Sequence, residues 1–186
     1  GALLILDEIQ TGVGRTGKMF GFENYNCTPD IVVYGKGLGG GLPIGAFTSS
    51  KKVMDTLQRN PIMGHITTFG GNPVISACAY ATLKKIYSSR IMENSLKKEK
   101  LIRSILIHPL IKEIRGKGLM LCLIMRTPKI ADELILTAKD NGLLLFWLLI
   151  NKNAVRITPP LTISNKEIKK GCNIIINILN DIKLKC

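Results

Sequence analysis

The sequence has few aromatic residues, few acidic residues and no long apolar run, and each shortage excludes a class of function. Phe, Trp and Tyr together make up 5% of the 186 residues, which is too few for the stacking surface that binds single-stranded nucleic acid. The longest apolar run, 143–150, is far shorter than the about 20 residues that cross a bilayer. We therefore expect no membrane partner and no nucleic-acid partner.

Negative charge is also scarce, because 13 Asp and Glu stand against 26 Lys and Arg and leave a net charge of +13. The lysines occur in small separate groups, such as Lys84-Lys85 and Lys97-Lys98, and no aromatic residues alternate with them. This pattern favours a solvated basic surface. A basic nucleic-acid-binding module remains an alternative that rests on charge alone.

The five cysteines form no C-x-x-C motif and no Cys/His cluster, so we expect no metal site. Cys78 and Cys122 lie in apolar stretches and are interpreted as buried thiols. Unpaired thiols of this kind favour a cytoplasmic or similarly reducing compartment.

The order of apolar runs and amphipathic stretches predicts an α/β fold in two parts. Continuous apolar runs indicate buried strands at 2–6, 31–34 and 44–48, and an Ala-rich segment after Pro73 indicates a helix over 73–87. We expect 1–87 to be part of a large, mostly parallel domain, 88–108 a linking helix and 109–186 a small α+β domain. Because a strand-like run begins at residue 1, we also expect the chain to be a C-terminal fragment.

Two charged side chains follow predicted strands and form the candidate site. Asp7 ends the first strand, and Lys36 follows the second inside the glycine-rich stretch 35–41. If both strands belong to one parallel sheet, both side chains lie at its carboxyl edge, where ligands bind in open α/β sheets. We expect both groups to be shielded from water. Pyridoxal phosphate would suit the pair, because it carries a pyridinium nitrogen for Asp7 and an aldehyde for Lys36.

Spacing alone leaves other interpretations open. Asp7 could be a solvated residue at a strand end, and Lys36 a loop cation. The stretch 35–40 also matches the G-x-G-x-x-G pattern of dinucleotide-binding proteins, but that pattern must begin a helix, and the residues 42–47 that follow indicate a turn and a strand.

A resemblance to a known family extends over nearly the whole chain. Its motifs are Leu6-Asp7-Glu8-Ile9-Gln10-Thr11-Gly12, Gly14-Arg15-Thr16-Gly17, Pro29-Asp30-Ile31, the stretch 35–41, Pro43-Ile44-Gly45-Ala46, Thr67-Thr68-Phe69-Gly70-Gly71-Asn72-Pro73, Arg115-Gly116-Lys117-Gly118-Leu119 and Val155-Arg156-Ile157-Thr158-Pro159-Pro160-Leu161. In this order they resemble the class III pyridoxal-phosphate aminotransferases, and most closely the acetylornithine/ornithine branch. The resemblance implies fold type I: the later part of the large domain followed by the C-terminal small domain.

The resemblance also implies a role for each matching residue. Lys36 would form the Schiff base with pyridoxal phosphate and transfer the proton, and Asp7 would hold the pyridine nitrogen protonated. Gln10 would contact the phenolic oxygen of the ring, and Thr68 would bind the phosphate of the neighbouring subunit's cofactor in a homodimer. Arg156 would bind the substrate's α-carboxylate, because a guanidinium matches a carboxylate with two parallel hydrogen bonds.

The implied reaction transfers an amino group from N-acetylornithine or ornithine to 2-oxoglutarate, a step of arginine biosynthesis. Succinyl-diaminopimelate and 4-aminobutyrate are alternative donors, since the stretch 146–149 departs from the acetylornithine pattern. An inactive cofactor-binding remnant is a further alternative. The family's N-terminal half, with its main phosphate loop and an acidic partner for Arg156, is not in these residues, so we expect an incomplete sheet and no activity from this segment alone.

Overall fold

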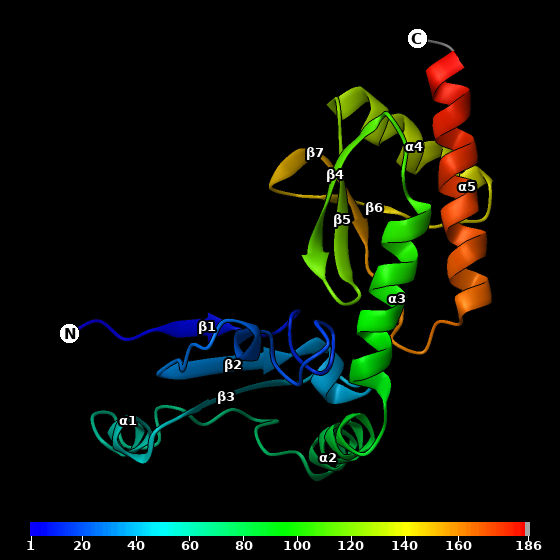
Figure 1. Cartoon of the computed structure of the whole chain (residues 1–186). Coiled ribbons are helices and arrows are strands. Elements are labelled where there is room, and N and C mark those ends of the chain that lie inside the picture. Colours follow the sequence, from blue (N-terminus) through cyan, green and yellow to red (C-terminus); the bar gives the residue numbers. More distant parts are fainter. Residues whose placement is uncertain (185–186) are drawn as a thin grey trace. The chain divides into compact units, whose positions relative to one another are not determined.

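The computed structural model describes residues 1–184, and these form two compact units that meet in the sequence between Met92 and Glu93. Figure 1 draws the first unit in blue to green and the second in green to red. Each unit has its own sheet, so each is described by itself.

The first unit is built on a three-stranded sheet in the order β1-β2-β3, formed by Ile5–Asp7, Ile31–Gly35 and Gly45–Ser49. Strand β2 runs parallel to β1, with Asp7 opposite Val33, and antiparallel to β3, with Gly35 opposite Gly45. The predicted strands are therefore present, although β1 is shorter than the apolar run that indicated it.

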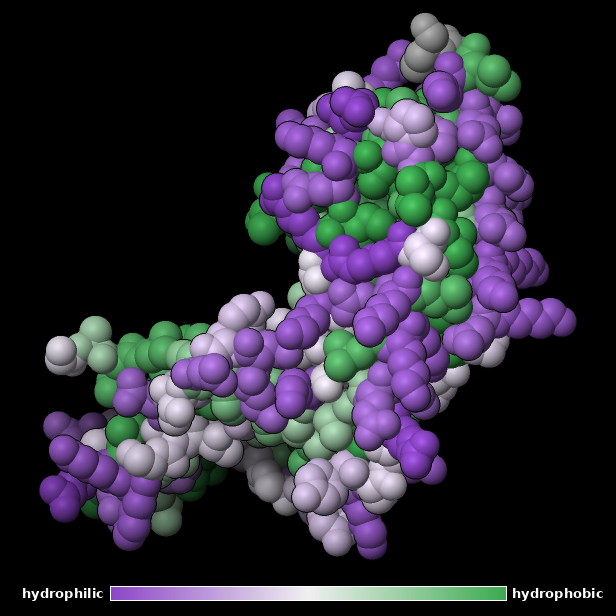
Figure 2. Space-filling view, viewed as in Figure 1, coloured by the Kyte–Doolittle hydropathy of each residue, from purple (hydrophilic) through white to green (hydrophobic). Residues whose placement is uncertain are grey.

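The apolar residues before and within β1 are more exposed than the sequence suggested. Leu3, Leu4 and Ile5 are 57%, 41% and 58% exposed, and Figure 2 shows hydrophobic surface near the N-terminus. The expectation of a buried strand is wrong for this part of the chain. The physical reason is that β1 is the edge strand of its sheet, and β2 is its one paired neighbour among residues 1–184.

The first unit has short helices between its strands and further helices after β3. Two 3-10 helices, η1 (Gly21–Asn24) and η2 (Lys36–Gly39), follow β1 and β2. After β3, residues 51–58 form α1 (Lys51–Met54) and the 3-10 turn η3 (Asp55–Gln58). Helix α2 (Pro73–Tyr87) begins where the sequence predicts, because the Asn72 side chain accepts the N–H groups of Val74 and Ile75.

The second unit holds all of α3 (Ile91–Ile105) except its first two residues, and it contains a four-stranded sheet in the order β4-β5-β7-β6. Its strands are β4 (Ile111–Lys117), β5 (Met120–Met125), β6 (Phe146–Leu148) and β7 (Asn151–Ile157). All neighbouring strands of this sheet are antiparallel. The glycine-containing stretch 114–118 is largely strand. Gly116 and Gly118 have φ of 107° and 61°, which lets the tight β4–β5 connection form without breaking β4.

Two amphipathic helices, α4 (Pro128–Asp140) and α5 (Asn165–Leu184), contribute to the main hydrophobic core. Their apolar residues share this core with alternate residues of β5 and β7, such as Leu121, Leu123 and Val155. Successive side chains of a strand point to opposite faces of the sheet. Because these core residues have odd numbers, even-numbered residues of β5 and β7 such as Cys122 and Arg156 lie on the other face.

Candidate functional site

The carboxyl edge of the β1–β2 pair holds the two residues singled out by the sequence. Because these strands are parallel, Asp7 and Lys36 end neighbouring strands at the same edge. Asp7 Oδ1 accepts the backbone N–H of Ile9 at 2.9 Å, which fixes the carboxylate at the start of the next turn. A carboxylate and an amine are thus presented at one edge of the sheet.

Lys36 has a strained backbone and an exposed side chain. Its φ is 43°, in the left-handed region that glycine adopts readily and lysine does not. Strain of this kind costs about 1–3 kcal/mol and is concentrated at functional sites. The expectation that Asp7 and Lys36 are shielded from water is wrong for this segment, because both are exposed where the described residues place no covering element.

A second strained residue packs beside the lysine. Val13, in the glycine-rich turn after β1, has a φ of 57° although its side chain is branched at Cβ. The Val13 side chain is buried, and a Cβ added at Gly37 would lie 3.6 Å from the Cβ of Val13. The turn after β1 and the turn after β2 therefore touch next to Lys36, a contact that spacing did not reveal.

Glu8 organises this edge and was missed by the sequence analysis. Its buried carboxylate accepts the Thr11 hydroxyl at 2.5 Å and the N–H groups of Gly21 and Phe22 at 2.8 and 2.7 Å. A Cβ at Gly21 would lie 2.9 Å from the Cβ of Thr11, so a glycine is needed there. Glu8 thus closes the loop between β1 and η1. The signal was the Asp-Glu pair itself, since adjacent strand residues point to opposite faces.

Gln10 and Thr68 lie in two different turns of the first unit. Gln10 is half-buried in the turn that directly follows Asp7, at the same sheet edge. Thr68 lies in the turn before α2, within the stretch 59–71 in which every residue is exposed. Helix α2 packs against η2, where a Cβ at Gly40 would collide with the Thr82 hydroxyl. The chain after Thr68 therefore reaches the lysine turn, whereas no hydrogen bond or ion pair within residues 1–184 joins Thr68 itself to that turn.

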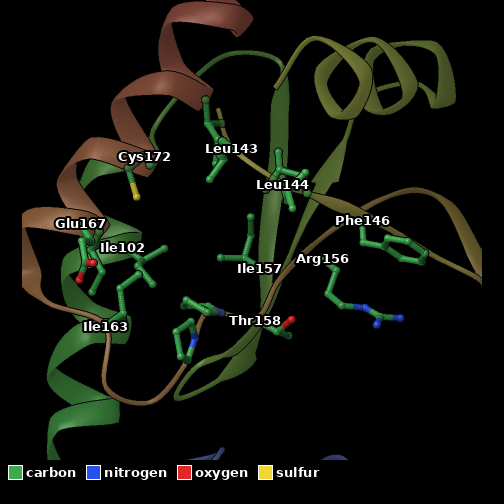
Figure 3. Close-up of a pocket in the computed structure, with 16 residues that line it drawn as sticks. Ile102, Leu143, Leu144, Phe146, Arg156, Ile157, Thr158, Ile163, Glu167 and Cys172 are labelled. Carbon is green, nitrogen blue, oxygen red and sulfur yellow. The ribbon is translucent and has the colours of Figure 1, made fainter. Parts of the chain in front are cut away.

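Arg156 belongs to the second unit and lies on β7 opposite Phe146 of β6 and Cys122 of β5. Its guanidinium carbon is 5.6 Å from the centroid of the Phe146 ring. Figure 3 shows Arg156 and Phe146 side by side at one end of a cavity of about 300 Å³. Most other lining side chains are apolar, such as Leu143, Ile157 and Ile163.

The cysteines of residues 1–184 form no disulfide bond. Cys27, Cys78, Cys122 and Cys172 are free thiols, while Cys186 lies outside the described residues. Cys78 and Cys122 are half-buried rather than buried as expected, and burial raises the pKa of Cys172 to about 11. No group of three His, Cys, Asp or Glu residues in this range could hold a metal ion, and no helix in it is long and apolar enough to cross a membrane.

Comparison with known proteins agrees with these features. The family description "Aminotransferase class-III" matches residues 1–179. The acetylornithine aminotransferase of Caldanaerobacter subterraneus is 41% identical to this chain. The match covers 97% of this chain and 46% of that protein. The acetylornithine aminotransferase of Haemophilus ducreyi is 37% identical over 97% of this chain and 44% of its own length. The chain thus spans about half the length of the curated relatives that it matches.

Solved structures give the same result. The acetylornithine aminotransferase from Elizabethkingia anophelis matches with a TM-score of 0.85 and 35% identity, over 97% of this chain and 46% of that one. The ornithine δ-aminotransferase of Plasmodium falciparum matches with a TM-score of 0.87 and 30% identity, over 100% of this chain and 49% of that one. These matches confirm the predicted α/β fold and the resemblance on which it was based.

Proposed function

The chain belongs to the class III aminotransferases, and we propose that it is the lysine-bearing part of a pyridoxal-phosphate enzyme of fold type I. The observation that carries this proposal is the parallel pairing of β1 and β2, which brings Asp7 and Lys36 to one sheet edge. The whole protein would transfer the amino group of N-acetylornithine or ornithine to 2-oxoglutarate, a reaction of arginine biosynthesis.

The groups at this edge fit pyridoxal phosphate. When bound, the cofactor supplies an aldehyde for an amine and a ring that withdraws electrons from the reacting carbon. The Lys36 amine would hold the aldehyde carbon and carry a proton as general base and acid. The Asp7 carboxylate would keep the ring nitrogen protonated through a charge-assisted hydrogen bond. Gln10, in the turn after Asp7, would contact the phenolic oxygen.

Substrate recognition is assigned to the second unit. Arg156 would bind the carboxylate of 2-oxoglutarate and of the amino donor. In support, Arg156 forms no ion pair with a carboxylate within residues 1–184, whereas Arg115 on the same sheet is paired with Glu113 at 2.5 Å. The N–H groups at the edge of Arg156 are therefore not committed to a protein carboxylate there.

We further propose that the whole protein is a homodimer in which Thr68 binds the phosphate of its partner's cofactor. The turn segment before α2 carries exposed apolar side chains, with Ile62 at 78%, Met63 at 64% and Phe69 at 77% exposure. Exposed apolar clusters of this kind are typical of interfaces. If the proposal is right, Phe69→Asp shifts the sedimentation of the whole protein from dimer to monomer, and Thr68→Val weakens cofactor retention in an intact dimer. Retention unchanged by Thr68→Val would remove Thr68 from the phosphate site.

A further segment of the whole protein would complete the first sheet. The exposed apolar residues at β1 and the chain's share of its relatives' length support this inference. The free thiols favour a cytoplasmic location for the whole protein.

The test is an amino-transfer assay on the whole protein with pyridoxal phosphate and 2-oxoglutarate. N-Acetylornithine, ornithine, succinyl-diaminopimelate and 4-aminobutyrate are offered separately, and glutamate formation is measured. We expect N-acetylornithine or ornithine to give the highest kcat/KM and Lys36→Ala to abolish turnover with every donor. A higher kcat/KM for one of the other two donors would replace the substrate assignment. Inactivity with all four would favour a cofactor-binding remnant.

A further inference from the structure

The residue opposite Arg156 in the sheet is an aromatic ring, not an acid. Phe146 and Arg156 are direct partners in the β6–β7 register, so both side chains stand on the same face. The guanidinium carbon lies 5.6 Å from the ring centroid, within the range of a cation–π interaction. Figure 3 shows the guanidinium extending alongside the ring.

The same row of the sheet contains a second arginine with a different partner. Arg115 lies opposite Cys122, and Cys122 lies opposite Arg156, so the two arginines stand two strands apart on one face. Arg115 Nη2 is paired with Glu113 Oε1 at 2.5 Å. A carboxylate partner occupies N–H groups that a substrate would need, whereas a ring covers the flat face of the guanidinium and leaves its edge to an incoming carboxylate.

Phe146 is itself held by its neighbour in a short strand. Trp147 Nε1 donates to Asp132 Oδ1 of α4 at 2.7 Å, which attaches the three-residue strand β6 to that helix. The Phe146 and Trp147 rings meet edge to face, with centroids 6.0 Å apart. The stretch 146–149 departs from the pattern expected of acetylornithine enzymes, and its two aromatic residues make these contacts.

We propose that Phe146 is a positioning residue that holds the Arg156 guanidinium with its N–H edge toward the substrate carboxylate. The inference rests on the proposed role of Arg156. An arginine side chain loses rotamer entropy when it binds. A ring that orders the side chain beforehand removes part of that cost without competing for the same hydrogen bonds.

The test measures the affinity of the whole holoprotein for glutarate, an unreactive dicarboxylate, by isothermal titration calorimetry. We expect Phe146→Leu to raise Kd about three- to tenfold, Phe146→Tyr to keep Kd within about twofold, and Arg156→Lys to raise it about tenfold or more. The matched control is Leu149→Ala, in the same stretch with Leu149 86% exposed, which should leave Kd unchanged.

The double variant separates positioning from packing. If Phe146 acts through Arg156, Phe146→Leu adds less than about twofold in the Arg156→Lys background. An equal loss in both backgrounds, or no loss in either, overturns the positioning role and leaves the role of Arg156 standing. An unchanged Kd in Arg156→Lys overturns both, while labelling of Lys36 decides the proposed reaction separately.

Discussion

Asp7 ends strand β1 opposite Val33, and Lys36 follows β2 directly, so the carboxylate and the amine leave parallel strands at the same edge. The two residues are 29 positions apart in the sequence. What brings them together is the hydrogen-bonded register of two short strands. The chemistry proposed for the chain depends on this relationship.

Removing the charge of Asp7 should slow the reaction without releasing the cofactor. Asp7→Asn keeps the size and the hydrogen bond to Ile9 but cannot stabilise a protonated ring nitrogen. We expect kcat of the whole protein to fall by two to three decades, equivalent to a loss of about 3–4 kcal/mol of transition-state stabilisation. Asp55→Asn, which changes an exposed partner of Lys51 on α1, serves as the control. Turnover similar in both variants would mean that another group holds the nitrogen.

Glu8 should be required for the stability of the first unit. Its carboxylate accepts three hydrogen bonds, two of them from backbone N–H groups. Glu8→Gln places an amide against those donors, and hydrogen bonds to charged groups contribute about 1.5–3 kcal/mol each. We expect the free energy of unfolding in urea to fall by about 3 kcal/mol. Glu23→Gln, an exposed carboxylate that accepts the Phe20 N–H, should cost less than about 1 kcal/mol. Equal losses would show that the burial of Glu8 has no special effect.

Acidification should destabilise the second unit through His108. Burial lowers the pKa of this histidine; the hydrogen bond to Asn180 opposes the shift, and the charge of Lys183 adds to it. Its Nδ1 accepts the N–H of Leu110 at 3.1 Å, so the neutral ring is the folded form. The unfolded chain takes up the proton near pH 6.5. Stability is therefore full above this pH and is lost as pH falls from there through the lower folded pKa.

The measurement is thermal unfolding of the whole protein between pH 8 and pH 5. Since the other histidine, His65, is exposed, His65→Gln should keep the acid-induced decrease in melting temperature. His108→Gln should reduce it. A decrease that is identical in both variants would assign the acid sensitivity to other groups.

Cys172 should be the least reactive of the described thiols. It is 5% exposed, and burial raises its pKa to about 11. At pH 8 about one molecule in a thousand would then carry the thiolate that reacts with iodoacetamide. Mass spectrometry should find Cys27 and Cys78, which are half-buried, alkylated well before Cys172. In urea the four thiols should react at similar rates. Rapid labelling of Cys172 in the folded protein would mean that α5 opens readily.

Local signals predicted the helices well and the environment of the site poorly. Asn72-Pro73 and Ser164 mark helix starts through side-chain hydrogen bonds that depend on nearby residues alone, so α2 has the predicted bounds and α5 begins directly after Ser164. Burial of Asp7 and Lys36 depends on what packs over them, and no local pattern contains that information. The apolar runs predicted the strands β1 and β2, but their parallel pairing was a condition of the prediction, which the structure meets. The strained backbone of Val13 and the hydrogen bonds of Glu8 exist only once the loop after β1 is folded, so no local pattern predicts them.

Reductive labelling of Lys36 tests the central proposal most directly. The whole protein is loaded with pyridoxal phosphate, reduced with borohydride and digested, and the peptides are mapped by mass spectrometry. Lys36→Arg provides the control, because it keeps the positive charge but not the primary amine. The account predicts one pyridoxyl label, on Lys36, and none in the variant. A label on a different lysine in an active protein would contradict it.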